Sequence, residues 1–204
     1  MQFKAVFQAT ISLDQLVADF ASAFKAVDST QPIGRSKTRT YKPGIGPLQE
    51  REVISRALRH LKSLKPHIYS SASPKKYPGL AQQCDLVVPD EWALEFKLLR
   101  PFGDNGAEAE HWSENVLHPY KGNVSSIGDV FKLRDSAFRE RKGIIIFGYE
   151  HSPPRIELSV AISAFELIAQ HVVRLKLGPR CSAFFNELIH PYHQQGWIYG
   201  WELL

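Results

Sequence analysis

Three residues that lie close together in the sequence have side chains suited to metal-dependent hydrolysis. Asp85, Glu95 and Lys97 fall in the stretch 84–99, where apolar and polar residues alternate as they do in β-strands. If residues 89–91 form a turn, the numbers of facing residues add to 180, so Asp85 stands opposite Glu95. Facing Cβ atoms are about 4.5–5.5 Å apart, and like charges there are destabilising. We therefore expect a cation between the two carboxylates.

The same side chains would suit hydrolysis of a phosphodiester bond. Carboxylate oxygens are preferred ligands of Mg²⁺ and Mn²⁺. A bound metal lowers the pKa of its water and neutralises the scissile phosphate. Lys97 is on the same face of the predicted hairpin and can orient that water or stabilise developing charge. The opposite, core-facing side of the hairpin carries Leu86, Val88, Leu94, Phe96 and Leu98.

Asp85 followed by Glu95-Phe96-Lys97 resembles the motif of the PD-(D/E)XK nuclease superfamily, whose fold is called restriction-endonuclease-like. The resemblance implies that Asp85 and Glu95 bind the metal and that the Phe96 carbonyl is a further ligand. It also implies that Lys97 is the catalytic lysine.

The chain departs from this motif at the proline that gives it its name, because Cys84 precedes Asp85. Pro89 and Asp90 spell the missing pair, but they lie in the predicted turn, where Asp90 cannot face Glu95. An E-x-K pattern is also common on the solvent face of amphipathic strands. The facing position of Asp85 is what separates the two interpretations.

A helix is predicted over residues 48–65, before the hairpin, from its apolar stripe. Glu50 continues that stripe, whereas Glu52 aligns with the solvent-facing side of the helix. Glu50 is either a favourable charge in the first helical turn or a third acid turned towards the site. Related nucleases carry a glutamate on this helix, so the resemblance implies that Glu50 is an auxiliary metal ligand through water. Glu52 is the alternative.

The remaining elements of this region predict an order of helix, three strands, helix and strand. A short strand is expected at 67–71 before the hairpin, and a helix over 126–142, closed by Gly143, after it. The apolar run 144–149 is typical of a strand buried on both faces. This is the αβββαβ core of the superfamily, an α/β fold with a central mixed sheet flanked by helices.

Two polar residues of the helix 126–142 receive different interpretations. Asp129 follows Ser126 by three residues, as in a capping box. Lys132 lies off the apolar stripe, and in related nucleases this helix lends a polar side chain to the cleft. The resemblance therefore makes Lys132 a candidate for contact with nucleic acid.

The 204 residues are expected to form a single domain, 44% hydrophobic and 23% charged. Residues 1–47 would supply an extra N-terminal helix, predicted over 12–27, and a basic loop. Residues 48–149 would form the catalytic core, and residues 150–204 an apolar helix and two C-terminal strands.

A net charge of +4 permits nucleic-acid binding. The loop 28–47 either follows a phosphate backbone or is an ordinary solvated loop. A lysine pair leads into the strand of Asp85 and would flank the cleft. The candidate contacts in these two segments are Arg35, Lys37, Arg39, Lys42, Lys75 and Lys76.

Several classes of protein and site are not supported by the sequence. It has no run of 18 apolar residues and no signal-peptide pattern at its start, so a cytoplasmic location is expected. Its two cysteines give no disulfide framework. His190 and His193 lack a further ligand pair for zinc. The apolar helix predicted from 158 to 175 is either buried or used in a subunit contact, as in a homodimer.

The sequence thus predicts an endonuclease that uses Mg²⁺, with Mn²⁺ as a substitute. The resemblance to the superfamily favours DNA over RNA as the substrate and implies a role in restriction or defence. The alternatives are a nuclease-like module that binds nucleic acid without cutting it, and a globular protein-interaction domain.

Overall fold

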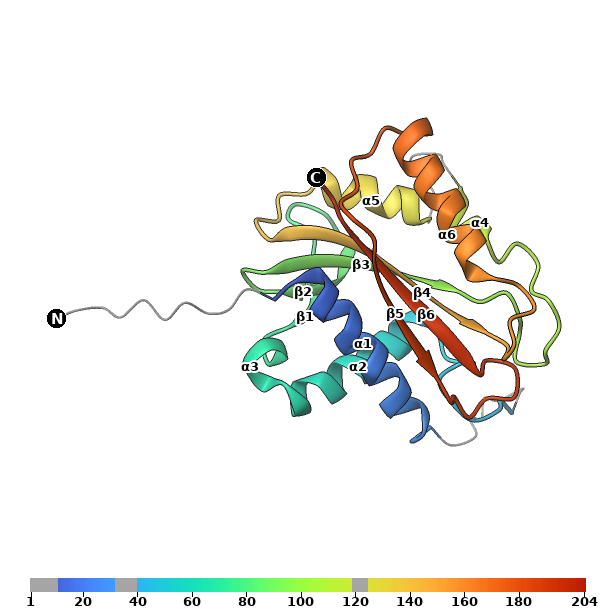
Figure 1. Ribbon diagram of the computed structural model, residues 1–204. Coiled ribbons are helices and arrows are strands. Elements are labelled where there is room, and N and C mark those ends of the chain that lie inside the picture. The colour runs from blue at the N-terminus through green and yellow to red at the C-terminus, as the bar shows by residue number, and fades with distance from the viewer. Residues whose placement is uncertain (1–10, 32–39, 119–124) are drawn as a thin grey trace.

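The computed structural model describes residues 11–31, 40–118 and 125–204. The strands are β1 (Ser73–Lys76), β2 (Gln83–Val88), β3 (Trp92–Leu99), β4 (Arg141–Glu150), β5 (Cys181–Asn186) and β6 (Gln195–Glu202). They form one mixed sheet in the order β1-β2-β3-β4-β6-β5 (Figure 1). β3 and β4 are parallel, and the other neighbouring strands are antiparallel.

Helices cover both faces of this sheet. They are α1 (Leu13–Asp28), α2 (Glu50–Leu64), α3 (Pro66–Tyr69), α4 (Glu114–Leu117), α5 (Ser126–Arg134) and α6 (Leu158–Leu167), which a π-helical turn, η1 (Ile168–Val172), extends. One buried cluster joins α1 and α2 to the sheet, and a second joins α4, α5 and α6 to the other face. The predicted α/β class, a mixed sheet flanked by helices, is confirmed.

The hairpin of β2 and β3 has the predicted register. Leu86 pairs with Leu94 and Val88 with Trp92, so the numbers add to 180 as expected. The apolar side faces α1 and α2, and the ring centroids of Phe20 and Phe96 are 5.1 Å apart. The other side of β3 therefore faces α5.

The strand predicted at 67–71 is wrong, because these residues begin in the helical turn α3. Pro66 is its first residue, where the fixed φ of proline and its missing N–H suit a helix start. The strand beside the hairpin is β1 instead, which pairs with β2 up to Lys76 and Gln83.

The helix predicted over 126–142 is shorter, because α5 ends at Arg134 and β4 already begins at Arg141. Gly143 does not close a helix but lies within β4. A Cβ there would be 2.9 Å from Leu94 Cδ2 and 3.1 Å from the Trp201 carbonyl oxygen, so a side chain would require its neighbours to shift. Glycine here permits close packing of neighbouring strands.

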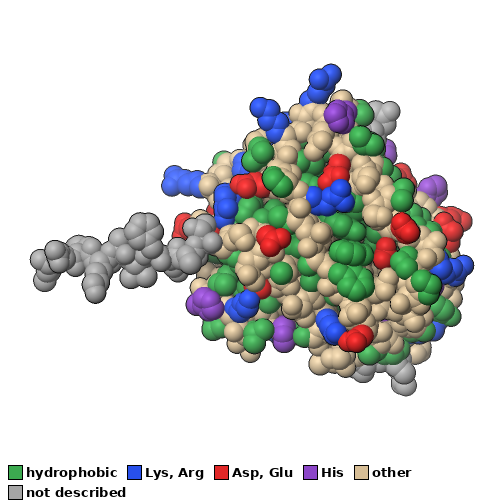
Figure 2. Space-filling view, viewed as in Figure 1, with side chains coloured by type: hydrophobic (Ala, Val, Ile, Leu, Met, Phe, Trp, Pro, Cys, Tyr) green, Lys and Arg blue, Asp and Glu red, His purple; other side chains and the backbone are tan. Residues whose placement is uncertain are grey.

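The N-terminal helix is found close to its predicted position, and two strands follow α6 in the C-terminal segment, as predicted. Ser12 caps α1 by accepting the N–H of Gln15 at 3.1 Å. Hydrophobic side chains gather over β5 and β6 on the face shown in Figure 2. Among the described residues, no helix is long and apolar enough to cross a membrane.

Candidate metal and active site

The site lies where β2 and β3 stop pairing. Their ladder reaches Leu94 and is not assigned beyond it in the described chain. From there, two carboxylates accept the N–H groups of β3. Phe96 donates to Asp85 Oδ2 at 2.9 Å, and Leu98 donates to Glu50 Oε2 at 2.6 Å. Asp85 of β2 and Glu50, the first residue of α2, thus replace a missing strand partner.

Asp85 and Glu95 lie on the same side of the hairpin and interact directly. Glu95 is only 2% exposed, and Tyr77 donates its hydroxyl to Glu95 Oε1. Burial raises the pKa of Glu95 to about 9, and the charge of Asp85 and a hydrogen bond with it add to this effect. At neutral pH the pair therefore holds a proton that a metal ion would have to displace.

Lys97 is paired with an acid from the facing helix. Its Nζ lies 2.6 Å from Asp129 Oδ2. This oxygen accepts no aligned hydrogen bond among the described residues, so charge is the main attraction. Burial would lower the pKa of Lys97, but the charges of Asp129, Glu50 and Asp85 outweigh it and raise the pKa. Lys97 is therefore an ammonium at neutral pH.

The sequence predicted that Asp129 takes part in capping its helix, and this prediction is wrong. Ser125, one residue earlier than expected, is the N-cap and accepts the N–H of Gly128 at 3.1 Å. Asp129 is free to pair with Lys97 because the helix end is already satisfied.

Lys132 also lies among the acids. Its Nζ is 2.8 Å from Asp129 Oδ1, 3.3 Å from Glu95 Oε1 and 5.0 Å from the centre of the Tyr77 ring. In this arrangement its charge balances the buried carboxylates, which differs from the predicted contact with nucleic acid.

Glu50 and Glu52, the two candidates for the auxiliary acid, have different surroundings. Burial raises the pKa of Glu50 to about 7, with the charges of Asp85 and Asp129 adding to it. Glu52 instead pairs with Arg56 at 2.6 Å on the exposed side of α2. Only Glu50 belongs electrostatically to the site.

The described residues contain no preassembled group of three or more Asp, Glu, His or Cys side chains that would hold an ion directly. Mg²⁺ does not require one, since it commonly binds one or two carboxylates and keeps several waters. Asp85 and Glu95 meet that need. The Phe96 N–H points to Asp85, and in a strand the carbonyl of the same residue faces the same edge. These donors fit a hydrated Mg²⁺.

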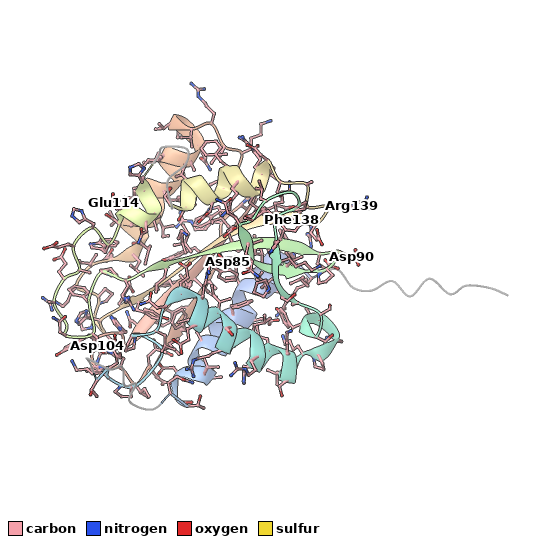
Figure 3. All side chains as sticks on the ribbon, turned by 180° about the vertical axis from the view of Figure 1, so that it is seen from behind. Asp85, Asp90, Asp104, Glu114, Phe138 and Arg139 are labelled. Carbon is pink, nitrogen blue, oxygen red and sulfur yellow. The ribbon has the colours of Figure 1, made fainter. Side chains whose placement is uncertain are left out.

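A polar cleft of about 370 Å³ is lined by Glu50 and Lys97, but not by Asp85 or Glu95. Glu50, Lys97 and Arg100 line one side, and His111 and Trp112 of the following loop line another. A smaller cavity of about 110 Å³ reaches Asp85 between α2 and the β1–β2 pair. Figure 3 shows Asp85 between α2 and α5.

Asp90 lies at the far end of the hairpin in Figure 3. It is exposed in the turn after β2, with a φ of 64°. The Pro89–Asp90 pair is therefore a turn, as predicted, and is remote from Glu95.

Of the basic residues predicted to contact nucleic acid, Arg35, Lys37 and Arg39 lie outside the described residues. Lys75 and Lys76 are exposed on β1 and pair with Cys84 and Gln83, next to Asp85. These two lysines thus remain near the site.

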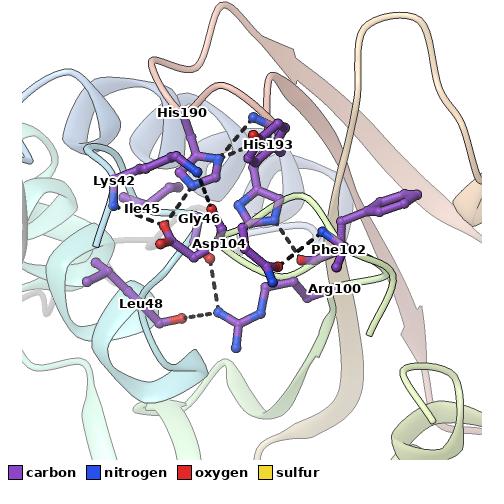
Figure 4. A network of polar contacts seen from close by, with 12 residues as sticks. Lys42, Ile45, Gly46, Leu48, Arg100, Phe102, Asp104, His190 and His193 are labelled. Carbon is purple, nitrogen blue, oxygen red and sulfur yellow. Dashed lines mark hydrogen bonds and ion pairs between the residues drawn. The ribbon is translucent and has the colours of Figure 1, made fainter. Parts of the chain in front are cut away.

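Lys42 belongs to the polar network shown in Figure 4, which also includes Arg100. Its Nζ donates to the Asp104 carbonyl at 2.7 Å, and Asp104 Oδ1 lies 3.0 Å from His190 Nε2. His190 Nδ1 accepts the N–H of His193. These contacts join three loops, including the one that leads into Glu50, so Lys42 has a structural partner.

Tyr77, Asp129 and Arg100 were not predicted to belong to the site. Asp129 could have been suspected, because it lies three residues before Lys132 on one helix face. Tyr77 and Arg100 carry no comparable signal in the sequence.

Comparison with protein-family models, curated proteins and solved structures gives no match to this chain.

Proposed function

We propose that this protein is a metal-dependent endonuclease with a restriction-endonuclease-like fold. The observation that carries the proposal is the register of the hairpin, which places Asp85 and Glu95 on one face, close enough for their carboxyl groups to interact. Lys97 follows Glu95 by two residues on the same strand, and Glu50 adds a coupled acid from α2.

The order of elements supports the proposed fold. The main elements from α2 to β4 are a helix, the three antiparallel strands β1–β3, the helix α5, and β4, which is parallel to β3. This is the order expected for the αβββαβ core, with the acids at the point where the hairpin opens.

Asp85, Glu95 and the Phe96 carbonyl would hold Mg²⁺ or Mn²⁺, and Glu50 would contact the ion through water. When bound, the ion supplies a water of lowered pKa and neutralises phosphate charge. Lys97 acts as a cation that orients the attacking water and stabilises charge on the phosphate. Its raised pKa argues against a role as general base at neutral pH.

DNA is the proposed substrate, and restriction or defence the proposed setting. Both follow from the resemblance to the superfamily. Lys75 and Lys76 would contact the phosphate backbone beside Asp85, where exposed lysines supply affinity without sequence preference.

The test is cleavage of supercoiled plasmid with Mg²⁺ or Mn²⁺, compared with EDTA. Asp85→Asn should lower the rate by about 10²-fold or more, because it removes a charge at the metal while keeping an acceptor for Phe96 N–H. Lys97→Met should be similarly impaired. Asp90→Asn is the matched control, because it makes the same chemical change in the exposed turn, and asparagine tolerates the positive φ of this position.

Unchanged cleavage by Asp85→Asn would refute the proposal. Metal-independent retardation of DNA on a gel, with no cleavage by the wild type, would favour the silent binding module instead.

One observation favours a protein contact elsewhere on the molecule. Val160, Leu167 and Val172 are large apolar residues of α6 and η1, and each is at least 60% exposed. A homodimer through this surface would bury them, and sedimentation analysis of the wild type and of Leu167→Glu would test it.

A further inference from the structure

Arg100 uses only one nitrogen of its guanidinium group to bind the protein. Its Nη1 donates to the carbonyls of Gly46 at 3.0 Å and Leu48 at 3.2 Å. Its Nε and Nη2 have no protein partner within the described residues, and Figure 4 shows the second terminal nitrogen without a contact. The side chain is half-buried. One edge of the fork is therefore fixed while donors on the rest of it are available.

The available donors lie beside the proposed active site. Arg100 directly follows β3, three residues after Lys97, and lines the same cleft as Lys97 and Glu50. The charges lining this cleft are balanced, with Glu50 and Glu110 against Lys97 and Arg100. Since Lys97 is already paired with Asp129, Arg100 is the better placed of the two cations to receive an anion.

We propose that Arg100 binds a non-bridging oxygen of the phosphodiester next to the one that is cleaved. This inference rests on the proposed nuclease function and adds a substrate contact to it. The physical basis is preorganisation. An arginine forms strong charge-assisted bonds with phosphate, and the two backbone carbonyls already restrict its rotamers before substrate arrives. Lysine could supply the charge but not the fork.

A purely structural role is the competing explanation, because the carbonyls that hold Arg100 belong to the loop before Glu50. The two roles differ in their dependence on salt. A residue that neutralises a phosphate contributes about 0.9 to the slope of log affinity against log salt concentration. A residue that only positions a loop contributes nothing to that slope.

The experiment measures binding of a fluorescein-labelled 20-base-pair DNA duplex in EDTA, at several salt concentrations. Arg100→Met should bind about tenfold more weakly and lower the salt slope by about 0.9. Arg100→Lys should keep most of the slope while losing affinity. Arg141→Met is the matched control, since Arg141 also donates to a backbone carbonyl, that of Ile11, but lies at the other end of β3 and β4.

Arg100→Met with a wild-type salt slope would overturn the inference, even if its melting temperature or Mn²⁺ affinity fell. Absence of duplex binding by the wild type would overturn it as well. If the slope changes as expected but the wild type cleaves no DNA with metal, the phosphate contact stands and the nuclease proposal fails.

Discussion

The buried carboxyl group of Glu95 should make the metal-free protein less stable as pH rises. Its pKa is about 9 in the folded protein, whereas an unperturbed glutamate has a pKa of 4.5. Between these values the folded state binds the proton that the unfolded chain has released, so the free energy of unfolding falls with increasing pH. The slope from one such group is at most about 1.4 kcal/mol per pH unit. From pH 6 to pH 8 the loss is roughly 2–3 kcal/mol.

Glu95→Gln removes this titration while keeping the size of the side chain and an acceptor for Tyr77. Urea unfolding in EDTA at pH 6, 7 and 8 measures the effect. The variant should gain roughly 2–3 kcal/mol relative to the wild type between pH 6 and pH 8. Glu52→Gln is the control, because Glu52 is exposed and should leave the pH dependence unchanged. Parallel pH curves for the wild type and Glu95→Gln would refute the reasoning.

Metal binding should show the reverse dependence on pH, because an ion at Glu95 must displace the same proton. Mn²⁺ affinity is expected to rise up to about tenfold per pH unit below pH 9, with about one proton released per ion. Calorimetry in two buffers of different ionisation enthalpy measures this release. Binding without proton release would place the ion away from Glu95.

Three further predictions concern neighbouring residues. Asp129→Asn removes the ion pair of Lys97, so the pKa of Lys97 should fall. The alkaline limb of the pH profile of cleavage should then move to lower pH, and an unchanged profile would count against the pairing. Lys132→Met should bind Mn²⁺ roughly tenfold more tightly, which corresponds to about 1.4 kcal/mol, because the Lys132 ammonium no longer competes for the carboxylates. Calorimetry measures the affinity, and equal affinity in the wild type and the variant would show that Lys132 does not compete. Gly196→Ala should lower the free energy of unfolding by roughly 1–3 kcal/mol, since the added Cβ would lie 2.2 Å from the Gly148 carbonyl oxygen. Urea unfolding measures this loss, and a variant as stable as the wild type would contradict this packing.

The hairpin was predictable because its two faces differ. A shift of one residue would have turned Leu86, Leu94 and Phe96 away from the core formed with α1 and α2 and brought polar residues into it, so the apolar face of the hairpin favours the observed register. The same register places Asp85 near Glu95. Local alternation in the sequence therefore contained the central geometry of the site.

The partners of these residues were less predictable, because they come from distant segments. Asp129 fits a local capping pattern in the sequence, and its pairing with Lys97 depends on how α5 packs against the distant strand β3. Arg100 is held by main-chain carbonyls, which leave no signature in residue types. The segment before the hairpin was misassigned because Pro66 starts a helical turn within a short, turn-rich stretch.

The contacts at the edge of β3 also limit how an ion can be held. Asp85, Glu50 and Glu95 each commit one oxygen to a protein donor, namely the N–H groups of β3 for the first two and a tyrosine hydroxyl for the third. Chelation of an ion by both oxygens of one of these carboxylates would therefore compete with its hydrogen bond to the protein. Ca²⁺ takes six to eight oxygens and often uses chelating carboxylates, whereas Mg²⁺ brings much of its own octahedral water shell. In the proposed nuclease, the opened strand edge would therefore favour the smaller ion and leave coordination positions to water and to the oxygens of a substrate.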